Sequence, residues 1–88
     1  MTELSSQCQP GPIFYDVFSG YLHVLGTNVK EWSTPHGVSA NNAKLAATGG
    51  WNGPKARALR QKMIETVGEE TFARLYRERM AAEQKRVA

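Results

Sequence analysis

The sequence lacks the residue patterns that metal sites and common catalytic centres require. Its one cysteine, Cys8, has no second thiol to pair with, so an internal disulfide is impossible and a reducing compartment is the natural setting. The histidines and Asp16 follow no zinc-binding spacing, and no glycine-rich phosphate loop is present. We therefore expect a protein that is not an enzyme and that uses no metal or cofactor.

Long hydrophobic runs are also missing. No apolar stretch in the 88 residues approaches the length that crosses a bilayer, and the mean hydropathy is negative. The N-terminus has neither the basic start nor the apolar stretch of a signal peptide. We expect one small cytoplasmic domain with no membrane partner, preceded by a disordered arm over residues 1–11.

Acidic residues are scarce in the middle of the chain, where Glu31 is the only one between Asn28 and Lys62. The basic residues of this stretch are Lys30, Lys44, Lys55, Arg57, Arg60 and Lys62. Such an excess is typical of a surface that neutralises phosphates. The stretch from Met63 onward mixes both signs of charge and is typical of a solvated helix.

The window 29–48 has the spacing of a helix-turn-helix unit. This unit needs an apolar and then a small residue in its first helix, a glycine and an apolar residue in the turn, and small residues inside its second helix. Those places hold Trp32, Ser33, Gly37, Val38, Ala43 and Ala46. The small residues let the two helices cross closely. The pattern predicts DNA binding, and a purely structural helical hairpin is the alternative.

Local signals set the boundaries of this unit. Asn28 and Glu31 form a capping-box pair before the first helix, and Ser39 caps the second, which ends at Gly49. Pro35 should bend or shorten the first helix. We expect His36 to be half-buried against the second helix.

The segment before the unit has two interpretations. As a helix from Pro12 to Gly26, it places its large apolar side chains on one face, and as a hairpin it turns at Ser19 and Gly20. We favour the helix, because it completes a three-helix core.

After the unit, a glycine-rich loop over 48–54 carries Trp51. Its side chain has two interpretations, a lid over the edge of the core or a stacking partner for a sugar or base. A fourth helix then runs from Pro54 to Gly68, with Ala56, Leu59, Met63 and Val67 as its apolar stripe. Cations in its first two turns should contact phosphates beside the helix N-terminus. They are Lys55, Arg57 and Arg60.

The second helix of the unit should read bases with its outward residues. They are Ser39, Asn41, Asn42, Lys44 and Thr48. A last amphipathic helix over 69–88 carries a stripe that we expect to drive self-association, or else to pack on the fourth helix. The stripe is Phe72, Leu75, Tyr76 and Met80, and a Glu70 to Arg74 pair should support the helix.

The runs GTNVKEWSTPHGVSANNAKLAATGG and GPKARALRQKMIETVG resemble small phage-associated DNA-binding proteins of lambda-repressor-like type. The match lies in Trp32 and the run from His36 to Ser39, and it covers residues 26–68. Pro35, the enlarged loop and the added C-terminal helix depart from the pattern.

The helical patterns together predict an all-α protein of about five helices, with a compact lambda-repressor-like helix-turn-helix domain over 12–68 and an added amphipathic helix over 69–88. The resemblance implies a phage or mobile-element transcriptional regulator. Because one unit reads only a short half-site of double-stranded DNA, we expect the protein to bind as a homodimer or higher oligomer. Alternatives are a recombination directionality factor or terminase-like subunit, and a protein-interaction module such as an anti-activator.

Overall fold

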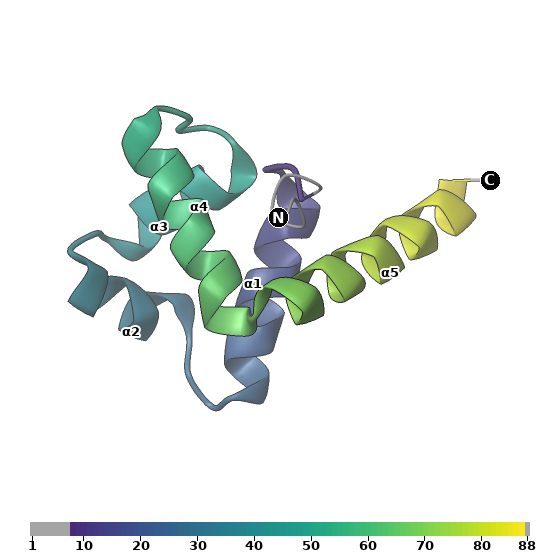
Figure 1. The fold of residues 1–88 in the computed structure, drawn as a ribbon, viewed down its shortest axis with the longest axis horizontal. Coiled ribbons are helices and arrows are strands. Elements are labelled where there is room, and N and C mark those ends of the chain that lie inside the picture. Colours follow the sequence, from purple (N-terminus) through teal and green to yellow (C-terminus); the bar gives the residue numbers. More distant parts are fainter. Residues whose placement is uncertain (1–7, 88) are drawn as a thin grey trace.

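The computed structural model describes residues 8–87, and it describes side-chain burial as far as Lys85. All regular secondary structure in this part of the chain is helical. Its elements are α1 (Pro12–Val24), α2 (Val29–Ser33), the 3-10 helix η2 (Thr34–His36), α3 (Ala40–Thr48), α4 (Pro54–Val67) and α5 (Glu69–Val87). The helices α1 to α4 cluster together, and α5 leaves the cluster as a long arm (Figure 1). The all-α prediction is confirmed, and the hairpin alternative for the segment before the unit is wrong.

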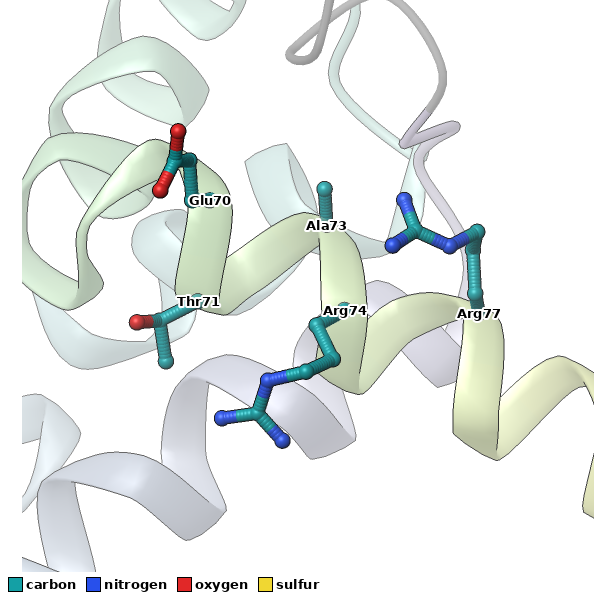
Figure 2. A pocket seen from close by; sticks show the side chains of 5 residues that line it. All are labelled: Glu70, Thr71, Ala73, Arg74 and Arg77. Carbon is teal, nitrogen blue, oxygen red and sulfur yellow. The ribbon is translucent and has the colours of Figure 1, made fainter.

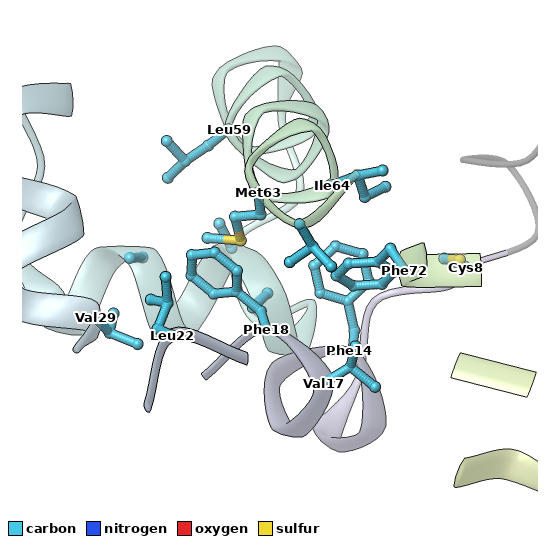
Figure 3. Close-up of a cluster of buried hydrophobic side chains, with 14 of the residues drawn as sticks. Cys8, Phe14, Val17, Phe18, Leu22, Val29, Leu59, Met63, Ile64 and Phe72 are labelled. Carbon is cyan, nitrogen blue, oxygen red and sulfur yellow. The ribbon is translucent and has the colours of Figure 1, made fainter. Parts of the chain in front are cut away.

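Aromatic side chains from α1, α2 and α5 fill the centre of the molecule. Figure 3 shows those of α1 and α5, which are Phe14, Phe18 and Phe72. The rings of Phe14 and Phe72 lie 4.7 Å apart between centroids, and both residues are fully buried. Phe18 meets Trp32 edge to face at 4.9 Å, which joins α1 to α2. Met63 of α4 is also fully buried and completes this cluster. Large aromatic area removed from water in this way is the main driving force for so small a fold.

The first half of α5 belongs to the core, and its second half projects past α1 (Figure 1). Phe72, expected on a self-association surface, is fully buried against α1, so that assignment is wrong. Leu75 and Tyr76 are half-buried, and Met80 is 36% exposed. The stripe is therefore divided between core and surface.

Part of the expected disordered arm is an ordered strap over residues 8–11, while residues 1–7 lie outside the described part of the chain. Cys8 is buried, and burial raises the pKa of its thiol despite the opposing charge of Arg77. The backbone N–H of Gln9 donates to the Tyr76 hydroxyl at 3.2 Å. The N–H of Gly11 donates to the carbonyl of Ala47 at 2.9 Å. Polar composition predicted disorder, but these bonds satisfy the backbone and tie α3 to α5.

Candidate nucleic-acid interface

The first helix of the predicted unit is short for an identifiable reason. Asn28 caps α2 by accepting from the N–H of Glu31 at 2.9 Å, as expected. The Glu31 carboxylate accepts from the Thr27 hydroxyl at 2.6 Å rather than from the cap amide, so only half of the capping box forms. Pro35 has no N–H to continue the α-helical bonding, and the chain tightens into η2. Gly37 then turns the chain at φ 75°, a left-handed conformation that glycine adopts readily.

Small side chains line the crossing of α2 and α3, as the sequence predicted. Ser33 is 1% exposed, and its hydroxyl donates to the Val29 carbonyl at 2.6 Å, which satisfies this buried polar group. Ala43 and Ala46 are fully buried on the inner face of α3. A larger residue at any of these positions would force the helices apart.

The outward face of α3 carries exposed polar side chains. Asn41, Asn42 and Lys44 are all exposed, and the Lys44 ammonium lies 5.5 Å from the centre of the Tyr15 ring. The Ser39 hydroxyl caps the helix by accepting from the N–H of Asn42 at 3.1 Å. The Thr48 hydroxyl donates to the Lys44 carbonyl at 2.8 Å. The amides and the ammonium are therefore the groups most available to an external partner.

Arg60 does not contribute to an exposed cationic surface, contrary to expectation. It is 9% exposed, and its guanidinium donates to the Ala46 carbonyl at 2.8 Å and to Oδ1 of Asn52 at 2.7 Å. Burial, and secondly the charge of Arg57, lower its pKa from a very high ordinary value. This side chain holds the end of α3 and the following loop, so its assignment as a phosphate contact is wrong.

The two remaining cations of the predicted cluster lie on different sides of α4. Arg57 lines a hollow beside the N-terminal strap, with Cys8, Gln9 and Pro10. Lys55 lines a separate hollow next to the α2–α3 turn, together with Lys62. Residues two apart on a helix point in nearly opposite directions, whereas residues seven apart share a face. Spacing along α4 would have identified Lys62 as the partner of Lys55.

We call this second cavity the turn-side hollow. It has a volume of about 320 Å³. Its lining residues are His36, Gly37, Val38, Trp51, Lys55, Ala58, Leu59 and Lys62.

His36 and Trp51 stand at the edge of the turn-side hollow. The His36 ring is exposed and stacks on Trp32 at 4.0 Å between centroids, so its expected packing against α3 is wrong. Its Nδ1 lies 2.8 Å from the Trp32 carbonyl and carries the proton, because a carbonyl oxygen only accepts. Trp51 is half-buried against the core, as the lid interpretation expects, and its backbone N–H donates to the Leu45 carbonyl at 3.1 Å.

A further hollow lies along α5, with a volume of about 410 Å³ (Figure 2). Arg74 and Arg77 project beside it, and the Glu70 carboxylate shares its lining. Arg74 pairs with Glu78 at 3.6 Å instead of with Glu70 as expected. Both signs of charge therefore line this surface, whereas no acidic residue lines the turn-side hollow.

Among residues 8–87, no group of three histidine, cysteine or acidic side chains is placed to hold a metal ion. None of the described helices is both long and apolar enough to cross a membrane. No protein-family model, curated protein or solved structure matches this chain.

Proposed function

We propose that this protein binds double-stranded DNA and inserts α3 into the major groove. The observation that carries the proposal is the arrangement of α3 itself. Its inner face of small residues is buried, while its outer face presents two amides and an ammonium group. Asn side chains can pair with adenine through two hydrogen bonds, and a lysine can bond guanine or phosphate.

The proposed contacts fall into two groups. Asn41, Asn42 and Lys44 read bases, with the Ser39 and Thr48 hydroxyls in a secondary role because both are engaged within α3. Lys55 and Lys62, which line the same hollow, contact phosphates together, and the exposed Arg57 contacts phosphates from the other side of α4. Phosphate contacts supply affinity and orientation, and base contacts supply specificity.

The role that fits such binding is transcriptional regulation in a phage or mobile element, with a recombination or terminase-like subunit as the alternative. One unit reads only a short half-site, so self-association is part of the proposal. The surface best suited to it is a mostly apolar groove of about 500 Å³ between α1 and α5. Val17, Tyr21, Val24 and Leu75 line it, together with the ion pair between Asp16 and Arg79. A DNA-binding role also implies a cytoplasmic location, where bacterial DNA lies.

Exposed apolar side chains at the end of α1 favour a second candidate function, a protein-interaction module. Val24, which lines the groove, is 81% exposed, and Leu25, which follows it in the chain but does not line the groove, is 57% exposed. Clustered exposed apolar side chains mark interaction sites more often than single ones do. In this second candidate function, the groove between α1 and α5 binds another protein and α3 does not bind DNA.

Salt-dependent binding of a labelled duplex distinguishes the candidates, with fluorescence anisotropy as the measurement. Host-genome fragments retained by the protein supply the preferred site. We expect Lys55→Gln and Lys62→Gln each to lower the slope of log K against log salt by roughly one. Lys85→Gln on α5 is the matched control and should leave the slope unchanged.

Substitutions on α3 test the base contacts separately. Asn41→Ala should cost about 1 to 3 kcal/mol on the preferred site and much less on random DNA. Equal losses on both DNAs would remove this side chain from base reading. Absence of duplex binding by the unmodified protein at low salt would favour the protein-interaction module.

A further inference from the structure

The turn-side hollow combines apolar walls with an unbalanced positive charge. Val38, Trp51 and Leu59 pack against or within the core and supply apolar surface. Lys55 and Lys62 are exposed, and neither makes an ion pair with another residue of the described chain. No acidic residue belongs to its lining. The charge of the hollow is therefore left for an external anion to neutralise.

Two residues in the lining of the hollow have a small side chain or none. An added Cβ at Gly37 would meet no atom within 4 Å apart from its neighbours in the chain. Ala58 is exposed on α4 between the two lysines in sequence and contributes only a methyl group. Its volume of about 320 Å³ is at the lower end of the range for small-molecule sites, which are mostly apolar with a few polar groups.

We propose that the turn-side hollow binds a small planar aromatic anion, whose ring packs against Trp51 and whose carboxylate, sulfonate or phosphate group meets Lys55 and Lys62. The apolar walls favour a ring, and an indole face favours a planar one. The ammonium groups favour the anionic form over a neutral analogue. The site requires no DNA and goes beyond the proposed function.

The position of the hollow gives such a ligand a structural consequence. Val38 immediately precedes the cap residue of α3, and Trp51 follows its C-terminal glycines and bonds back to the Leu45 carbonyl. A ring seated between them contacts the segments that enter and leave α3. Binding therefore stiffens both connections of this helix at once.

Titration of the full chain with naphthalene-2-sulfonate, followed by backbone amide and indole N–H signals in NMR, tests the proposal. The uncharged 2-naphthol is the matched probe. We expect the sulfonate to shift Gly37, Val38 and the Trp51 indole N–H, which is assigned with a Trp51→Phe variant. 2-Naphthol should bind more weakly. Equal affinity of both probes, shifts centred on the α1–α5 groove, or no shift at millimolar sulfonate would overturn the proposal.

Two variants with matched controls make the test specific. The Lys55→Gln, Lys62→Gln double variant should weaken sulfonate binding roughly fivefold, whereas Lys85→Gln leaves it unchanged. Ala58→Leu should fill the hollow and abolish the shifts without unfolding the chain, because leucine is a strong helix former at an exposed position. Ala81→Leu, at an exposed position of α5, is the control for an effect of added apolar surface outside the hollow. Unaltered binding in both test variants would contradict the assignment, and spectra elsewhere in the chain verify the fold.

Discussion

The helices α3 and α5 show two opposite ways of holding a helix in place. α3 has nine residues, and its inner face packs against α1, α2 and α4. Its ends are fixed by the Ser39 cap, the Arg60 guanidinium and the N–H of Gly11. α5 has 19 residues. As far as Lys85, the ones buried in the core are Phe72 and Ala73, both in its first half, while its second half meets α1 through a surface ion pair between Arg79 and Asp16. A short helix therefore depends on contacts with its neighbours, whereas a long helix is maintained by its own backbone hydrogen bonds once one end is fixed.

The largest expected effect is a difference in stability between a side-chain truncation in the first half of α5 and one in its second half. Phe72→Ala removes a ring that is fully buried against Phe14, so we expect a loss of about 3 to 5 kcal/mol in the free energy of unfolding. Met80→Ala, on the projecting half, should change it by less than about 0.5 kcal/mol. Urea denaturation followed by circular dichroism measures both. Similar losses at the two sites would show that α5 is docked along its whole length.

The next largest effect concerns the end of α3. Arg60→Met keeps the aliphatic bulk but leaves the Ala46 carbonyl and Asn52 amide without their charged donor. We expect a loss of about 2 to 3 kcal/mol. Arg57→Met, at an exposed site one helical turn earlier, is the control and should change stability by less than about 0.5 kcal/mol. If the two variants melt alike, Arg60 does not hold α3.

A smaller effect is expected at the other end of α3. Ser39→Ala removes the oxygen that accepts from the N–H of Asn42 and should cost about 1 kcal/mol. Ser19→Ala in the interior of α1 is the matched control and should not destabilise, because alanine is the better helix former there. Thermal unfolding measures the difference, and equal melting temperatures would argue against the cap.

The smallest expected effect concerns the strap over residues 8–11, which connects α3 to α5. Burial raises the pKa of Cys8, so less thiolate is present at pH 8 than for an exposed cysteine, and labelling with a thiol reagent should be slow. Tyr76→Phe removes the hydroxyl that accepts from the N–H of Gln9 and should speed labelling several-fold. Tyr21→Phe serves as the control. An unchanged rate in the Tyr76 variant would show that this bond does not hold the strap.

Local signals in the sequence predicted most of the fold. Ser39, Gly49, Pro54 and Gly68 mark the ends of α3 and α4 where the structure has them, because caps and helix breakers act on their own neighbours. The break after Ser33 followed in the same way from Pro35.

The errors have a common physical cause in contacts between distant parts of the chain. Arg60 is an ordinary surface cation by spacing, and its bonds to the carbonyl of Ala46, 14 residues earlier, and to Oδ1 of Asn52 make it structural. Phe72 continues an amphipathic stripe, but its burial depends on Phe14 of α1. Periodicity identifies which face of a helix is apolar, whereas the partner that covers it is a property of the whole fold.

Because neighbouring helices hold α3 in place, its outward face is free to change by amino-acid substitution during evolution. Isolated helices shorter than about 12 to 15 residues are marginal in water, so a peptide of residues 28–50 should not retain the shape of α3. Within the intact domain, however, the exposed positions Asn41, Asn42 and Lys44 contribute little to stability. Substitutions there alter the chemistry that α3 presents while the scaffold is preserved. The outward face can therefore diversify, and the alanines beneath it cannot.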